Sequence, residues 1–286
     1  MLQIVLNLPQ RVVRSIKGRI LNIKYFFKRY KILLCERKKW DFMAVHNCYI
    51  AQLPFAIPLI CKPLKGKIQN HPNLLIVSND NFKKKPITQK CCEYLGIKNY
   101  HRIPSTHSGP WRHNAKIVDL HRYLSSLEKL PTYTLYVDSD DVIFRDDPSR
   151  AIEILKQEGC KILFGGVTYL GAYDLMQEAK EAIHQEARRR QANPLYIDCG
   201  VFISETSFLL KILEEGLRFI DASDIPAVTY KEWYRDGTLC EKLSKHPKGF
   251  PYGSGCDQEI MRFLQSKYPN EMKADFYDRL AKRGIG

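Results

Sequence analysis

Short apolar runs alternate with amphipathic stretches from residue 73 to residue 204. The apolar runs are typical of buried strands, predicted at 73–80, 99–104, 133–144, 161–166 and 195–204. The amphipathic stretches have apolar residues every three or four positions and predict helices, at 86–97, 111–127, 149–159, about 174–191, 206–219 and 256–268. This alternation predicts an α/β domain whose mainly parallel sheet is flanked by helices.

A basic arm and a connector are predicted before this domain, which divides the chain into residues 1–70 and 71–286. Residues 1–40 carry eleven basic side chains and one acid, so they hold +10 of the formal net charge of +14. Apolar residues recur there every three or four positions, which predicts an amphipathic helix. Two interpretations stay open: residues 11–39 contact an anionic membrane surface, or the helix packs on the main domain with its basic side solvated. Nucleic acid is not expected as a partner, because no recognised binding module accompanies the charge.

The cysteines and the lengths of the apolar runs indicate a cellular compartment. Nine cysteines are scattered through the chain without a C-x-x-C pair, which favours a reducing environment. No uninterrupted apolar run reaches the length of a membrane span. We therefore expect a cytoplasmic protein whose only membrane contact is peripheral, through the arm.

An acidic turn follows the predicted strand at 133–137 and carries the strongest chemical signal. It contains Asp138, Ser139, Asp140 and Asp141. Ligands bind at the carboxyl ends of strands in open α/β sheets, and carboxylates grouped there need a compensating cation. Mg²⁺ and Mn²⁺ prefer such oxygen ligands and keep positions open for phosphate. The nearby Asp146 and Asp147 are interpreted instead as residues that introduce the next helix.

A different chemistry shares this local pattern. Phosphatases of the haloacid dehalogenase type have a D-x-D-x-[TV] string after an apolar strand, and Asp138, Asp140 and Val142 satisfy it. That string normally opens its domain, whereas here a strand–helix–strand–helix unit precedes it. We therefore keep as an alternative function a phosphatase or nucleotidyltransferase that uses Asp138. A third class is a non-catalytic scaffold at a membrane surface.

Five segments, in order, resemble the glycosyltransferase domain of procollagen lysyl hydroxylases and related collagen sugar transferases. They are "NLLIVSND" (73–80), "GPWRHNAKIVDLHRYLSSL" (109–127), "LYVDSDDVIFRDDPSRAIEILKQEGCKILFGG" (135–166), "YIDCGVFIS" (196–204) and "GCDQEIMRFL" (255–264). The resemblance implies a fold of the glycosyltransferase A type, a Rossmann-like α/β sheet. It also implies a hexosyltransferase that uses Mn²⁺ or Mg²⁺ and a nucleotide-sugar, UDP-linked, as donor. A glycan, a lipid-linked glycan or a protein is the expected acceptor.

The resemblance also implies roles for individual residues. Asp138 and Asp141 match the metal-binding acids of the family. Positions that match the family's nucleotide site are Val77, Ser78, Asn79, Trp111 and Lys116. Positions that match its acceptor side and the acids near the transferred sugar are Asp198, Asp257 and Gln258.

Two departures from the family bear on the expected site. The family's third metal ligand is a histidine near the end of the domain, and this chain has no histidine after His246. Asp275 is expected to take that place, in preference to Asp278. Asp198 stands where the family has asparagine, which could alter the choice of acceptor or supply a base.

Overall fold

The computed structural model describes residues 42–46, 56–105, 113–168, 177–218, 220 and 257–283. All of them lie within one compact unit, residues 42–284. The basic arm lies outside the described residues. Among the described helices none is both long and apolar enough to cross a membrane.

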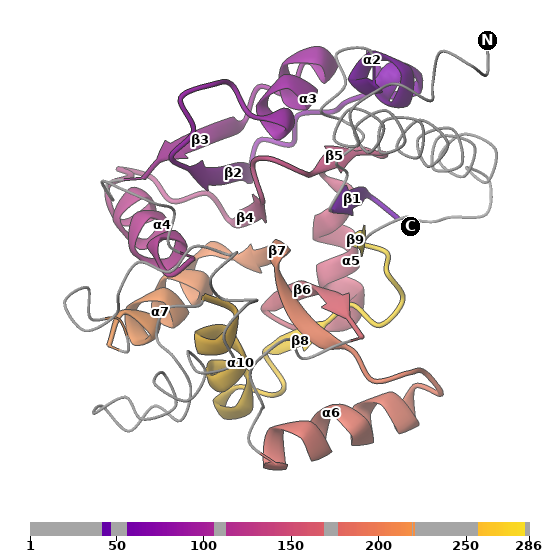
Figure 1. Ribbon diagram of the computed structural model, residues 1–286, viewed down its shortest axis with the longest axis vertical. Coiled ribbons are helices and arrows are strands. Elements are labelled where there is room, and N and C mark those ends of the chain that lie inside the picture. Colours follow the sequence, from indigo (N-terminus) through magenta and orange to yellow (C-terminus); the bar gives the residue numbers. More distant parts are fainter. Residues whose placement is uncertain are drawn as a thin grey trace, which may run out of the picture. The chain divides into compact units, whose positions relative to one another are not determined.

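A six-stranded sheet with the strand order β3-β2-β4-β7-β6-β8 forms the centre of this unit (Figure 1). Its strands are β2 (Leu74–Asp80), β3 (Tyr100–Pro104), β4 (Tyr133–Val137), β6 (Ile162–Val167), β7 (Tyr196–Glu205) and β8 (Met272–Ala274). β7 pairs in antiparallel fashion with both of its neighbours, β4 and β6, while the other ladders are parallel. The expected α/β class with a mainly parallel sheet is confirmed.

The direction in which the chain winds reverses beside β2. From β2 the chain passes through α3 (Ile87–Leu95) to β3 on one side, and then through α4 (Ala115–Ser125) to β4 on the other side. Such a reversal opens a crevice at the carboxyl ends of the two central strands, where ligands bind in open α/β sheets. Asp80 ends β2 and Asp138 follows β4 directly, so both lie at the carboxyl ends of these two strands.

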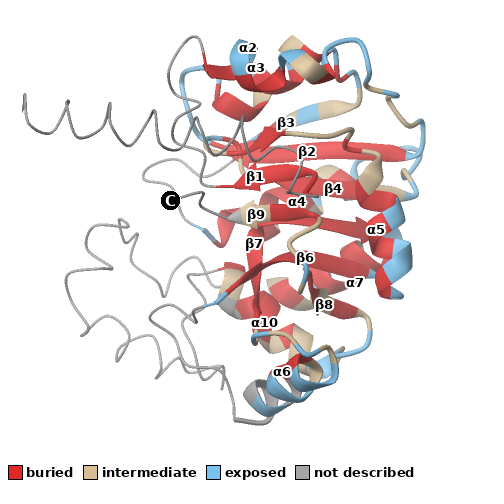
Figure 2. Cartoon of the chain, turned by 90° about the vertical axis from the view of Figure 1, so that its right-hand side faces the viewer, coloured by how far each residue is buried: buried red, intermediate tan, exposed pale blue. Residues whose placement is uncertain are grey.

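Helices lie on both sides of the sheet. Figure 1 shows α4, α7 (Thr206–Leu217) and α10 (Asp257–Lys267) along one side, and α5 (Arg150–Glu158) on the other. The first three share one apolar core with β2, β4, β6 and β7, to which α4 contributes Ile117, Leu120 and Leu124. Figure 2 shows most strands of the sheet buried between these layers, while the edge strand β3 is partly exposed. The remaining long helix, α6 (Gln177–Arg189), packs against α10.

Glycines end α3 and α5. Gly96 after α3 and Gly159 after α5 have φ values of 73° and 59°. Residues with a side chain rarely adopt this left-handed conformation, whereas glycine does so without steric cost. The backbone N–H of Gly96 donates to the carbonyl oxygens of Cys92 and Glu93 and closes the last turn of α3.

A second, three-stranded sheet with the order β5-β1-β9 was not predicted. β1 (Ala44–His46) pairs with β5 (Ile143–Phe144) and with β9 (Ala281–Arg283). The predicted strand 133–144 therefore divides at the acidic turn, and its two parts belong to different sheets.

The expected domain boundary at residue 71 falls inside this compact unit. Met43, Ala44 and Val45 are at most 2% exposed, so β1 is part of the core. α2 (Ala56–Cys61) and the short 3-10 helix η3 (Lys62–Leu64) follow it, and α2 packs on α3.

Candidate metal centre

Three potential metal ligands meet where β1 passes the end of β4. Nε2 of His46 lies 3.3 Å from Oδ2 of Asp138 and 3.6 Å from Oδ1 of Asp141. One atom of each side chain can be chosen so that all three lie within 4.8 Å of one another. The side chain of His46 is 6% exposed and that of Asp138 is 34% exposed, so the cluster is closed on the protein side and open at Asp138.

β7 contacts His46 through the ring nitrogen that does not face Asp138 and Asp141. Nδ1 of His46 lies 3.1 Å from Oδ2 of Asp198, and the other carboxylate oxygen of Asp198 accepts a hydrogen bond from the backbone N–H of Gly200 at 3.2 Å. The imidazole packs directly on Gly200, because a Cβ at that position would stand 2.0 Å from Cε1 of His46. Asp198 is 4% exposed and thus belongs to the wall of the site.

A buried lysine joins two of the acids. Nζ of Lys116, in the first turn of α4, lies 3.1 Å from Oδ1 of Asp138 and 2.8 Å from Oδ2 of Asp257. It also donates to the carbonyl oxygen of Cys199 at 3.0 Å and stands 4.7 Å from the centre of the Tyr136 ring. Lys116 is 6% exposed. It therefore holds acids from β4 and α10 together beside the cluster.

α3 fixes the acidic turn. The hydroxyl of Thr88 lies 2.7 Å from the carbonyl oxygen of Asp138 and 2.9 Å from that of Val142. The backbone N–H of Thr88 donates to the carbonyl oxygen of Ser139 at 2.9 Å, and the backbone N–H of Asp138 donates to that of Gly200 at 2.7 Å. The turn is thus held from α3 on one side and from β7 on the other.

Charge pairing shifts the titration of these groups. Burial disfavours the His46 cation, but the negative charges of Asp198, Asp138 and Asp141 outweigh burial and raise the pKa of His46 to about 10. Burial disfavours the charged form of Asp138 as well, but Lys116 and His46 outweigh it and lower the pKa of Asp138. Burial raises the pKa of Asp141 to about 6, against the pull of His46. The carboxylates of the site thus stabilise positive charge placed among them.

The three side chains fit a divalent first-row metal ion. One imidazole nitrogen and two carboxylate oxygens are a donor set that Mn²⁺ accepts, and a hard ion such as Mg²⁺ also takes the carboxylates. Neighbouring ligands of an octahedral ion bound at about 2.1 Å lie roughly 3 Å apart. The separations of 3.3 and 3.6 Å therefore need only small side-chain adjustments.

Other predicted site residues lie farther from this cluster or outside the described residues. Val77 is part of the apolar core. The hydroxyl of Ser78 is hydrogen-bonded to Tyr100 at 2.6 Å, and the amide of Asn79 donates to Asp119 at 3.0 Å. Trp111 lies outside the described residues. Gln258 follows Asp257 in the first turn of α10 and is partly exposed.

The structure does not bring Asp275 to the acids that it was expected to join. One of its carboxylate oxygens accepts from the backbone N–H of Leu280 at 2.5 Å, and the other from that of Tyr277 at 3.3 Å. It follows β8, which is three strands from β4 in the sheet, or about 14 Å at the usual strand spacing. Asp275 is fully buried, and its hydrogen bonds stabilise the turn between β8 and β9. Asp278, in the same turn, forms an ion pair with Lys282.

His46 is the residue of this site that the sequence analysis missed. It ends the run Phe42-Met43-Ala44-Val45, which is apolar but too short for a confident strand and adjoins the basic arm. The one available signal was the missing histidine of the family pattern, but that pattern places the histidine near the end of the domain, whereas His46 precedes the domain's first predicted strand. A ligand set assembled by the fold has no fixed order along the chain.

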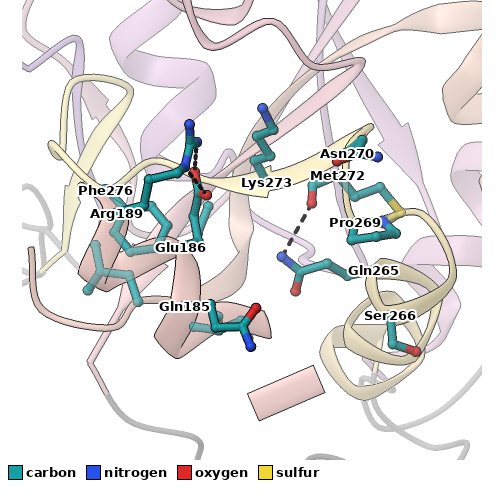
Figure 3. Close-up of a pocket in the computed structure, with 13 residues that line it drawn as sticks. Gln185, Glu186, Arg189, Gln265, Ser266, Pro269, Asn270, Met272, Lys273 and Phe276 are labelled. Carbon is teal, nitrogen blue, oxygen red and sulfur yellow. Dashed lines mark hydrogen bonds and ion pairs between the residues drawn. The ribbon is translucent and has the colours of Figure 1, made fainter. Parts of the chain in front are cut away.

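A cavity of about 660 Å³ lies elsewhere, among α6, α10 and β8. Figure 3 shows Gln265 donating to the carbonyl oxygen of Met272, and Glu186 paired with Arg189. None of the residues named above as site residues lines it.

Comparisons with known proteins do not identify a family for this chain. A scan against protein-family models gives no match, and a search of curated proteins gives none either.

Proposed function

We propose that the chain is a metal-dependent glycosyltransferase of the A-type fold, which transfers a hexose from a nucleotide-sugar to an acceptor hydroxyl. The observation that carries the proposal is the meeting of His46, Asp138 and Asp141 at the carboxyl end of β4. A divalent cation there supplies positive charge to the leaving nucleoside diphosphate. The donor is UDP-linked by resemblance, and the acceptor is a glycan, a lipid-linked glycan or a protein.

The chain's own residues then have distinct tasks. Asp138 is held by Lys116 through one oxygen and faces His46 with the other. Its partial exposure leaves room for phosphate oxygens beside the cation. Asp257 and Gln258 stand at the start of α10, and by resemblance they would contact the transferred sugar. Lys116 contacts two carboxylates. Its charge therefore compensates acids of the protein and is not reserved for a phosphate of the donor.

The geometry supports this function more than the phosphatase alternative. A D-x-D nucleophile mechanism pairs Asp138 with Asp140, but Asp140 is exposed. The acid that faces Asp138 across His46 is Asp141. A trapped aspartyl-phosphate at Asp138 would reverse this preference.

Release of UDP from a panel of UDP-sugars, with Mn²⁺ or with EDTA, tests the proposal. We expect Mn²⁺-dependent release, and loss of it in His46→Gln, Asp138→Asn and Asp141→Asn. Asp140→Asn and Asp275→Asn are matched controls that remove a neighbouring or a buried carboxylate and should stay active if folded. Thermal unfolding checks folding, and bound donor at one hundred times its Kd should add about 2.7 kcal/mol of stability.

Two results would contradict the proposal. Activity that survives Asp141→Asn but is lost in Asp140→Asn would mean that the wrong acids have been paired. No effect of any nucleotide-sugar or of Mn²⁺ on turnover or unfolding would favour the non-catalytic scaffold.

A further inference from the structure

Two residues of a single stretch of β7 hold the imidazole of His46. Nδ1 of the ring faces Oδ2 of Asp198 at 3.1 Å. The missing side chain of Gly200 leaves the space that the ring occupies, since a Cβ there would stand 2.0 Å from Cε1 and 2.4 Å from Nε2. Asp198 and Gly200 thus restrict the position of the ring.

This arrangement selects one protonation pattern for a metal-binding histidine. A neutral imidazole carries one N–H and one lone pair, and an ionised carboxylate can only accept. When a cation displaces the proton of Nε2, the remaining N–H stays on Nδ1, toward Asp198. The lone pair of Nε2, which faces Asp138 and Asp141, is then directed at the cation. A carboxylate behind a metal-bound histidine orients the ring and raises its basicity in this way.

The contacts of Asp198 favour this role over that of a base for the acceptor. One oxygen faces His46, the other accepts from the backbone N–H of Gly200, and the residue is 4% exposed. A general base must reach the proton that it removes, whereas both oxygens of Asp198 are directed at the protein.

We propose that Asp198 is a positioning residue, which together with Gly200 fixes His46 as the third ligand of the cation. The inference rests on the metal site of the proposed function. It replaces the expectation that Asp198 acts on the acceptor. It also explains why a glycine stands two residues after this acid on a strand that is otherwise rich in larger side chains.

A double-mutant cycle with Mn²⁺ alone as the probe tests this inference. Binding to the full chain is followed by the electron paramagnetic resonance signal of free Mn²⁺, so no sugar donor or turnover is needed. We expect Asp198→Asn to weaken Mn²⁺ binding at least about tenfold. In a His46→Gln background the same substitution should have little further effect, because the ring through which Asp198 acts is gone. Gly200→Ala, which displaces the ring, should weaken binding as His46→Gln does.

Asp140→Asn is the matched control. It removes one carboxylate from the acidic turn that carries Asp138 and Asp141, and it does not touch His46. It should change Mn²⁺ binding less than about fivefold. Equal weakening by Asp198→Asn in both backgrounds would show that Asp198 acts only as a charge and would overturn the inference, as would no weakening at all. If His46→Gln itself leaves Mn²⁺ binding unchanged, the metal site of the proposed function fails as well. Circular dichroism and thermal unfolding of each variant establish that the comparison is between folded proteins.

Discussion

At the scale of single residues, Lys116 compensates the negative charge of two acids of the site. Its ammonium group lies between Asp138 and Asp257 in a buried position. The sequence predicted a lysine near the donor phosphates, and the structure shows one already paired with carboxylates. Removing one partner of a buried pair leaves an uncompensated charge, which costs more than the pair itself contributes.

We expect Lys116→Met to lower the free energy of unfolding by about 3 kcal/mol. The methionine retains most of the volume of the lysine, so the loss would arise from the unpaired acids. Denaturant unfolding of both proteins measures it, with Lys98→Met, an exposed site, as the control. A loss no larger than that of the control would show that Asp138 and Asp257 do not depend on Lys116.

At the scale of elements, α3 determines where the acidic turn lies. The residues that form α3, β4 and the turn could be predicted locally, because each has its own periodicity or polar run. The contact between them depends on Thr88, whose hydroxyl reaches two carbonyl oxygens of the turn. Nothing in the sequence marks this threonine, since a buried threonine on a helix has many possible partners.

We expect Thr88→Val to destabilise the fold by about 1–2 kcal/mol and also to weaken Mn²⁺ binding. Valine has nearly the same shape, but it leaves buried carbonyl oxygens without their donor, and the turn would shift. Thr134→Val is the matched control, because Thr134 hydrogen-bonds Thr206 at 2.8 Å in another part of the core. It should lower stability similarly and leave Mn²⁺ binding unchanged. If both variants affect Mn²⁺ equally, the turn does not depend on α3.

At the scale of the whole molecule, the proposed metal centre connects segments that are far apart in the chain. β1 lies between β5 and β9 and carries His46 to the end of β4. A domain that begins at residue 71, as the sequence suggested, would lack both this strand and the proposed metal ligand His46. A domain that begins at residue 42 would contain both. The membrane role of residues 11–39 stays a prediction.

We therefore expect residues 42–286 to unfold cooperatively and to bind Mn²⁺ as tightly as the full chain does. Residues 71–286 should be much less stable or fail to fold, and should bind Mn²⁺ weakly, because β5 and β9 lose their shared neighbour. Thermal unfolding and Mn²⁺ titration of the two fragments test this. Equally tight binding by the shorter fragment would mean that His46 is not a ligand.

The sequence by itself determined the longer helices, most strands and the acidic turn, because helical and strand periodicities and helix-ending glycines are local signals. The acidic turn supplied Asp138 and Asp141, and the family resemblance added Lys116, Asp198 and Asp257; the structure brings these five residues together at one end of the sheet. Only the tertiary structure decided which groups face one another. His46 and Asp198 are 152 positions apart, and Asp275 looked suitable by its place in the chain. The pairing of strands from distant segments sets such distances, and no local pattern encodes it.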